Sequence, residues 1–214
     1  MDLLNIMQWN AQSIISNKQH LTQYLYDHNI HVAIISESWL SPDKHFNIKG
    51  YQIERNDIGN KHNGVAILIH NCIDYRKIHT FSDNSLQNIC VRITLNNREL
   101  SIVSFYCPTN CTPSFDKHKF QSLLESVPEP MIFAGDFNAH HTSWGCNSVN
   151  SRGRDILEIV DDNNLVLLNS GEVITGGSLS WHPNALDLTL VSPSLALLCD
   201  WSVVTIHLAA IIFL

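Results

Sequence analysis

Short runs of aliphatic and β-branched residues recur along the chain, and several of them are continuously apolar rather than alternating. Strands that are covered on both faces of a sheet have this continuous pattern, whereas strands with one solvated face alternate. The pattern therefore predicts central sheet strands with both faces buried. The predicted strands are 3–10, 31–39, 51–56, 64–70, 88–95, 100–108, 130–137, 165–170, 186–192 and 200–207.

Three other segments have the hydrophobic period of an amphipathic helix, with apolar residues three and four positions apart. Ser114 is expected to cap the second of these helices, because a serine side chain accepts a hydrogen bond from a free N–H of the first turn. The predicted helices are 17–29, 114–127 and 151–164.

The order of these elements is β-α-β, then several antiparallel strands joined by tight hairpins such as "LNNREL", then β-α-β again. Two mixed β-sheets packed face to face, with helices outside, satisfy this order within the rules for packing layers. No Pro/Gly/Ser-rich linker or shift in composition divides the chain. We therefore expect one domain over residues 1–214, of the α/β (α+β) class.

Composition and charge limit the function classes. Hydrophobic residues make up 44% of the chain and charged residues 15%, which is typical of a globular protein and not of a disordered one. With 13 Lys and Arg against 20 Asp and Glu, the net charge of -7 has the wrong sign for bulk electrostatic binding of a polyanion. Any binding of nucleic acid is therefore expected to be local or metal-assisted.

The ends and the cysteines indicate an intracellular protein. The N-terminus "MDLLNIMQWNAQ" has an early acid and no basic region, unlike a signal peptide, and no run approaches the roughly 18 apolar residues of a membrane span. The six cysteines have no C-x-x-C spacing, and a reducing compartment is the simpler interpretation. We expect no secretion and no membrane contact, in the cytoplasm or the nucleus; no compact basic localisation run is present.

Polar and acidic side chains fall in or directly after apolar runs, where burial without a partner would be costly. One such residue is unremarkable, but six of them suggest convergence on one site. They are Asn10, Glu37, Tyr106, Asp136, Asn138 and Asp187.

Glu37 and Asp187 with the Asn10 amide form an oxygen-only ligand set, which suits Mg²⁺ or Mn²⁺ better than zinc. Asp136 could then orient or deprotonate a water, while neutral donors bind a phosphate. This is the apparatus of metal-assisted phosphodiester hydrolysis. The hydrogen-bond donors toward the phosphate are Asn138, Asn10 and Tyr106.

Each residue also has a structural interpretation when it is taken alone. Asn10 could be a turn residue, Glu37 a charge at a strand end, Tyr106 a core aromatic with a solvated hydroxyl, and Asp187 an exposed partner in a hairpin. The two histidines that follow Asn138 are better explained as loop or packing residues than as metal ligands.

Six motifs follow one another along nearly the whole chain: "QWN", "SESW", "FYCPT", "GDFNAHHTSWG", "NSRGRDILEIVDDNNLVLLN" and "SWHPNALDLTLVSPSLA". This combination resembles the endonuclease/exonuclease/phosphatase superfamily, and within it the apurinic-type endonuclease domain of jockey-like non-LTR retrotransposons. The resemblance implies a four-layered α/β sandwich and Mg²⁺-dependent nicking of DNA at a target site. It also implies a reverse transcriptase on the same polypeptide; none follows here, so the chain is expected to be a fragment, a truncated copy or the product of a gene model cut short.

The resemblance also assigns roles to single residues. Glu37 would be the principal metal ligand, with Asn10 beside it and Asp187 close by. Asp136 would activate or position the water, and Asn138 and Tyr106 would contact the scissile phosphate. Near the DNA-facing rim it places Asn147, Arg152 and Trp144.

The C-terminus departs from the family, which closes with a Ser-Asp-His motif whose aspartate orients the catalytic histidine. The nearest match here is Thr205, Ile206 and His207, so either His207 keeps its role without a carboxylate partner or it is an incidental residue in a frameshifted or degenerate tail, and the second interpretation is slightly favoured. In the His-Asp pair of a different enzyme loss of the carboxylate lowers the rate about 10⁴-fold. The apolar ending "LAAIIFL" is expected to add an edge strand to an altered last part of the core.

Two alternatives to an active endonuclease follow. The first is a catalytically inactive remnant that folds and binds metal or nucleic acid, which Ile206 favours. The second is a lipid or inositol phosphatase of the same superfamily, since fold alone does not choose the substrate. The motifs "AHHTSWG" and "LVLLN" favour the retrotransposon branch over the phosphatases.

Overall fold

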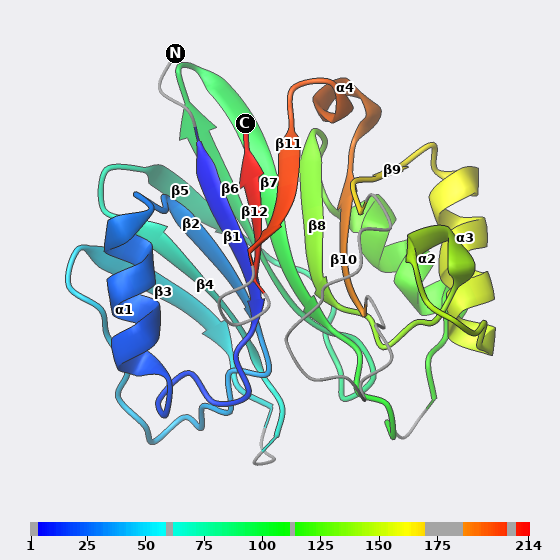
Figure 1. Ribbon diagram of the computed structural model, residues 1–214, viewed down its shortest axis with the longest axis horizontal. Helices are drawn as coiled ribbons and strands as arrows, with labels where there is room; N and C mark the ends of the chain where they lie inside the picture. Colours follow the sequence, from blue (N-terminus) through cyan, green and yellow to red (C-terminus); the bar gives the residue numbers. More distant parts are fainter. Residues whose placement is uncertain (1–3, 59–61, 112–113, 170–185, 205–208) are drawn as a thin grey trace.

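The computed structural model describes residues 4–58, 62–111, 114–169, 186–204 and 209–214, which form two six-stranded sheets lying face to face (Figure 1). The first sheet has the strand order β11-β12-β1-β2-β4-β3, with β1 and β2 parallel and the other neighbours antiparallel. Its strands are β1 (Asn5–Asn10), β2 (Val32–Ser36), β3 (Tyr51–Asn56), β4 (Val65–His70), β11 (Asp200–Val204) and β12 (Ala209–Phe213).

The second sheet has the order β5-β6-β7-β8-β10-β9. Only the pair β7 and β8 is parallel among its described neighbours, so this sheet is mixed as well. Its strands are β5 (Asp74–Ile78), β6 (Gln87–Leu95), β7 (Arg98–Tyr106), β8 (Met131–Asp136), β9 (Val166–Leu167) and β10 (Asp187–Val191).

Helices cover the outer faces of both sheets, as predicted (Figure 1). One apolar core lies between the sheets, a second lies between the first sheet and α1, and a third lies between the second sheet and α2 with α3. This confirms the four-layered sandwich. The helices are α1 (Lys18–Asp27), α2 (Lys117–Ser126), α3 (Ser151–Asp162), the short α4 (Pro193–Ala196) and the 3₁₀ turn η1 (Thr142–Trp144).

Two local predictions are corrected. Asp116, and not Ser114, caps α2, because its carboxylate accepts hydrogen bonds from the backbone N–H groups of His118 and Lys119. Strand β5 escaped prediction because it is mostly polar and exposed, so it lacks an apolar run. Of the predicted strand 165–170, residue 170 lies outside the described residues, and only Val166–Leu167 of the rest form a strand, β9.

Strand β12 is not at an edge, contrary to the prediction from its apolar sequence. It lies between β1 and β11 and pairs with both, with Phe213 opposite Asn5 on one side and Asp200 on the other. Its alternate side chains enter different cores, Ile212 between the sheets and Ile211 on the side of α1. A strand with two buried faces and two paired edges explains why this segment is apolar throughout.

No described helix has the length and apolar character needed to cross a membrane. Cys72, Cys90, Cys107, Cys111 and Cys199 are free thiols.

Candidate active site at the end of the sandwich

The pairing of the strands brings the predicted polar residues to one end of the sandwich. Parallel β1 and β2 end together, with Asn10 opposite Ser36, so Glu37 directly follows at the same edge. In the facing sheet, Asp136 at the end of β8 pairs with Asp187 on one side and with Tyr106 on the other. Strand ends are rigid supports, so these side chains are held in a fixed arrangement.

Asn10 joins the two sheets. Its Nδ2 donates hydrogen bonds to Glu37 Oε1 and to Asp136 Oδ2, each at 2.9 Å. Its Oδ1 accepts a hydrogen bond from the backbone N–H of Gln12 at 3.4 Å. The amide therefore acts here as a donor between two carboxylates, which differs from the predicted role of Asn10 as a metal ligand through its oxygen.

Glu37 combines an uncommon backbone conformation with a carboxylate that is hydrogen-bonded at both oxygens. Glu37 has φ 50 and Trp39 has φ 51, values that non-glycine residues seldom adopt. The backbone carbonyl of Glu37 accepts the N–H of Ser13 at 3.1 Å, and its Oε2 accepts the Trp39 indole N–H at 3.3 Å. With Asn10 on Oε1, both carboxylate oxygens are engaged.

Gly135 explains how β8 delivers Asp136 to this place. Gly135 has φ +152, and a Cβ there would lie 1.8 Å from the carbonyl oxygen of Phe105 on the neighbouring strand. Only glycine allows this close approach. Beyond it, Asp136 Oδ1 accepts the backbone N–H of Asn138 at 2.9 Å, while Asn138, at φ 47, donates its side-chain amide to the carbonyl of Cys107 at 3.2 Å.

Negative charge accumulates in this site. Burial raises the pKa of Asp136 well above its usual value, and the charge of Asp187 raises it further. Burial, followed by the charge of Glu37, raises the pKa of Asp187 in the same way. None of the ion pairs among the described residues involves these three carboxylates.

Tyr106 belongs to the same cluster. Its hydroxyl donates a hydrogen bond to the Glu37 carboxylate, and burial followed by the Glu37 charge raises the pKa of this phenol. The side chain is only 7% exposed. A phenol that keeps its proton in this setting is a permanent neutral donor.

The donor set fits a divalent cation that prefers oxygen ligands. Asp187 Oδ1 is sealed from solvent and has no hydrogen-bond partner among the described residues. A buried carboxylate oxygen without a partner is costly, and a cation would remove that cost. No three His, Cys, Asp or Glu side chains in the described parts of the chain form a ligand group by themselves. A site here therefore needs an amide or another oxygen in addition to the carboxylates.

Residues 100–209 match the family model described as endonuclease-reverse transcriptase. The chain belongs to the endonuclease-reverse transcriptase family. Among curated proteins, it is 23% identical over 192 residues to the RNA-directed DNA polymerase from mobile element jockey of Drosophila funebris, covering 88% of this chain and 21% of that protein. It is 27% identical over 171 residues to the probable RNA-directed DNA polymerase from transposon X-element of Drosophila melanogaster, covering 78% of this chain and 19% of that protein. The chain thus spans about a fifth of the length of these relatives.

Solved structures show the same fold. The endonuclease domain of TRAS1, a telomere-specific non-LTR retrotransposon, superposes with a TM-score of 0.79 at 18% identity, covering 99% of this chain and 98% of that one. The AP endonuclease from Leishmania major gives a TM-score of 0.80 at 13% identity, covering 99% of this chain and 87% of that one. These likenesses confirm the predicted sandwich.

Two of the residues that family resemblance placed at the DNA-facing rim make hydrogen bonds within the chain, and their contact with DNA stays a prediction. Trp144 is 1% exposed, and its indole N–H donates to the carbonyl of Ala139 at 3.0 Å. The Arg152 guanidinium donates to the carbonyls of Cys107, Phe137 and Pro108, each at 3.1 Å. Both side chains therefore support, from within, the loops that carry the site.

Asn147 is exposed, and its contact with DNA stays a prediction. The predicted catalytic His207, with Thr205 and Ile206, lies outside the described residues.

Sequence reasoning missed Gln8, a glutamine buried in the middle of β1 that hydrogen-bonds to the Asp187 carboxylate. The signal that could have identified Gln8 is its position as a polar residue between apolar neighbours, Met7 and Trp9, of a buried strand.

Proposed function

We propose that the chain is the endonuclease part of a non-LTR retrotransposon protein and nicks DNA by divalent-cation-dependent hydrolysis of a phosphodiester. The observation that carries this proposal is the Asn10 amide bridging Glu37 and Asp136 between the two sheets, with Asp187 and Tyr106 beside it. Membership of the endonuclease-reverse transcriptase family and the likeness to the TRAS1 endonuclease domain support it.

Glu37, Asp187 and Asn10 would hold the cation, Mg²⁺ or Mn²⁺, because hard cations prefer carboxylate and amide oxygens. Asn10 would present its oxygen after a half-turn of its amide. When bound, the cation supplies positive charge that offsets the negative charge of the phosphate oxygens.

Asp136 is the group we expect to take a proton from the attacking water. The backbone N–H of Asn138 fixes Oδ1 of this carboxylate, and before a cation binds the Asn10 amide also holds Oδ2. Because burial raises the pKa of this carboxyl, its anion is a stronger base than an exposed aspartate. Orientation and basicity then act together on one proton.

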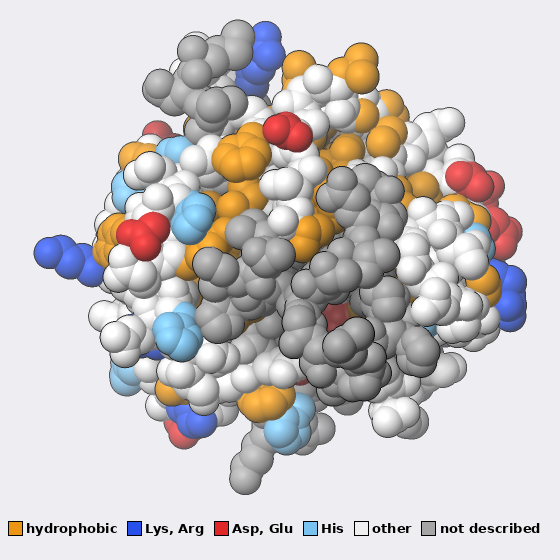
Figure 2. All heavy atoms as spheres, in the orientation of Figure 1, with side chains coloured by type: hydrophobic (Ala, Val, Ile, Leu, Met, Phe, Trp, Pro, Cys, Tyr) orange, Lys and Arg blue, Asp and Glu red, His pale blue; other side chains and the backbone are white. Residues whose placement is uncertain are grey.

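The phosphate would be bound by neutral donors, the Tyr106 hydroxyl and the Asn138 amide. Neutral donors stabilise an anion without the bulk positive charge that this protein lacks. On the face shown in Figure 2, the Lys and Arg side chains of the described residues are isolated from one another near the outline of the molecule and form no basic patch. DNA would therefore be held through the site itself and through local contacts such as Asn147.

The partners follow from the same proposal. The substrate is DNA, and the reverse transcriptase named in the relatives would act on the same nicked target. Such a protein would act where it meets chromosomal DNA, in the nucleus.

A catalytically inactive copy is the second candidate, and Ile206 in place of an aspartate favours it. This copy would fold and retain the carboxylate cluster, but His207 would lack the carboxylate that orients it.

Nicking of supercoiled plasmid by the purified chain, with Mg²⁺ or with EDTA, tests the proposal. Three variants accompany the wild type: Asp136→Ala, His207→Ala and, as a matched control, Asp161→Ala on the exposed face of α3. We expect nicking only with Mg²⁺, a loss of about 10²- to 10⁴-fold in Asp136→Ala, and no change in the control.

The outcomes separate the two candidates. A loss in His207→Ala would show that this histidine works without a carboxylate partner. If the folded wild type is as silent as Asp136→Ala, the chain is an inactive copy and the first proposal is wrong.

A further inference from the structure

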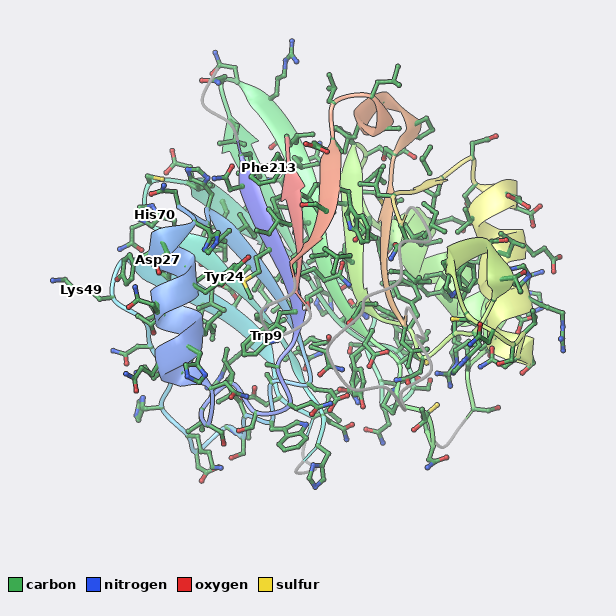
Figure 3. The ribbon with its side chains drawn as sticks, viewed as in Figure 1. Trp9, Tyr24, Asp27, Lys49, His70 and Phe213 are labelled. Atoms are coloured by element: carbon green, nitrogen blue, oxygen red, sulfur yellow. The ribbon has the colours of Figure 1, made fainter. Side chains whose placement is uncertain are left out.

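Two polar side chains lie in the apolar core between the sheets, one layer below the candidate active site. Gln8 on β1 is 2% exposed, and Thr189 on β10 is fully buried. Trp9 lies on the α1 side of the first sheet (Figure 3). Because side chains alternate along a strand, Gln8 and Asn10 on either side of it face the second sheet, where they contact Gly135 and Asp136. Gln8 therefore shares its face with Asn10 and lies deeper in the molecule.

A directed chain of hydrogen bonds runs through these residues. The Trp201 indole N–H on β11 donates to Thr189 Oγ1 at 3.2 Å, and the Thr189 hydroxyl donates to Gln8 Oε1 at 2.6 Å. The indole N–H fills one acceptor site of the Thr189 hydroxyl, whose own proton goes to Gln8, and the Gly135 carbonyl can only accept from the nitrogen end of the same amide. This fixes which end of the Gln8 amide is the acceptor.

The nitrogen end of the Gln8 amide is consequently turned toward the site. Its Nε2 donates to the carbonyl oxygen of Gly135 at 3.2 Å and to the Asp187 carboxylate. The backbone of Asp187 is held separately, since Asn169 Nδ2 donates to its carbonyl at 2.8 Å. Gln8 is thus the contact on the Asp187 side chain, whose other oxygen has no partner among the described residues.

We propose that Gln8 is a positioning residue for the Asp187 carboxylate, and that Trp201 and Thr189 set its orientation. This inference rests on the proposed function, because it concerns the same cation site. The contact with Gln8 would hold the carboxylate so that Oδ1, which is buried and has no hydrogen-bond partner among the described residues, is available to a cation. Partners of this kind behind a metal ligand are commonly worth 10- to 100-fold in metal affinity, which sets the expected size of the effect at about that range.

A purely structural role is the competing explanation, since Gln8 also ties the sheets together. Ser104 offers a matched control: it is fully buried, and its hydroxyl donates across the sheets to the carbonyl of Ile35 at 2.8 Å. Loss of either contact should lower stability, but only Gln8 contacts the Asp187 carboxylate. Metal affinity, measured apart from activity, therefore distinguishes positioning from sheet attachment.

The experiment measures Mn²⁺ binding to the full chain by electron paramagnetic resonance, with thermal unfolding recorded on each variant. Gln8→Met removes the donor while keeping the length of the side chain. Thr189→Val removes the hydroxyl that orients it, and Thr189→Ser restores that hydroxyl. We expect Gln8→Met to weaken Mn²⁺ binding about 10-fold or more, Thr189→Val to weaken it less, and Thr189→Ser to recover wild-type affinity.

Ser104→Ala should unfold at a lower temperature while binding Mn²⁺ as the wild type does. Equal affinity in the wild type, Gln8→Met and Thr189→Val would overturn the positioning role while leaving the proposed nuclease intact, provided nicking persists. If the wild type binds Mn²⁺ but does not nick DNA, and Gln8→Met binds Mn²⁺ more weakly than the wild type, Gln8 positions Asp187 in an inactive copy. A wild type that binds no Mn²⁺ would refute both. Should Gln8→Met fail to fold, the Thr189 pair still decides the question.

Discussion

Arg152→Leu removes a guanidinium that holds together the loops on either side of the candidate active site. In the folded chain, Arg152 Nη1 donates to the carbonyls of Cys107 and Phe137, and Nη2 donates to that of Pro108. The guanidinium also lies over the ring of Phe115, 5.7 Å from its centre. Leucine keeps a similar apolar volume but donates nothing.

The expected cost follows from the carbonyls that are left without a donor. Cys107 retains a donor, since the Asn138 amide also binds its oxygen at 3.2 Å. The carbonyls of Phe137 and Pro108 accept no other hydrogen bond from a described residue. Each such loss costs about 1–3 kcal/mol, and water can reach Pro108, so we expect a decrease of about 2–4 kcal/mol in the free energy of unfolding.

Thermal unfolding followed by circular dichroism measures the change. For a chain of this size, 1 kcal/mol corresponds to about 2–4 °C, so the midpoint should fall by roughly 4 to 16 °C. The neighbouring exposed Arg154 supplies the control, and Arg154→Leu should unfold close to the wild-type temperature. Anisotropy of a labelled DNA duplex in Ca²⁺ is recorded on the same samples.

The two interpretations of Arg152 give opposite results. If Arg152→Leu unfolds at the wild-type temperature and binds the duplex more weakly, Arg152 contacts DNA and the structural argument is wrong. If the midpoint falls and the folded fraction binds DNA normally, Arg152 acts as an internal clamp.

Three smaller predictions follow from the same structure. Gly135→Ala should destabilise the chain by about 4 kcal/mol or more in urea unfolding, because its Cβ would meet the Phe105 carbonyl at 1.8 Å. Gly50→Ala, whose Cβ would meet nothing closer than 3.7 Å, should cost only about 1 kcal/mol for its positive φ. Burial raises the pKa of Asp187 to about 7, so the folded state holds a proton that the unfolded state releases above about pH 4. In EDTA, the free energy of unfolding should therefore fall as the pH rises from about 4 to 7, and Asp187→Asn should flatten this slope; a wild type whose stability rises over that range would contradict the assignment.

Much of the candidate site could be predicted from sequence because a strand places its last residues without help from distant contacts. Asp136 ends one apolar strand and Asp187 begins another, and pairing of β8 with β10 places them opposite each other. Glu37 was predicted on the same grounds, although its unusual backbone conformation was not. The apolar pattern likewise predicted the central strands, since burial on both faces demands it.

Side-chain roles that depend on contacts between sheets could not be predicted in this way. Arg152 and Trp144 follow the family motif, and only the folded loops show that both point inward to backbone carbonyls. The position of β12 between β1 and β11 depends on partners that lie far apart in the sequence.

By itself, the sequence determined which segments form strands and helices and which acids and amides stand at strand ends. Those properties come from local hydrophobic period and from the alternation of side chains along a strand. The tertiary structure decided what each polar group contacts: that Asn10 bridges Glu37 and Asp136, and that Gln8 supports Asp187 from below. The physical reason is that the energy of a buried hydrogen bond depends on its distance and direction, which are set only when the two sheets pack together.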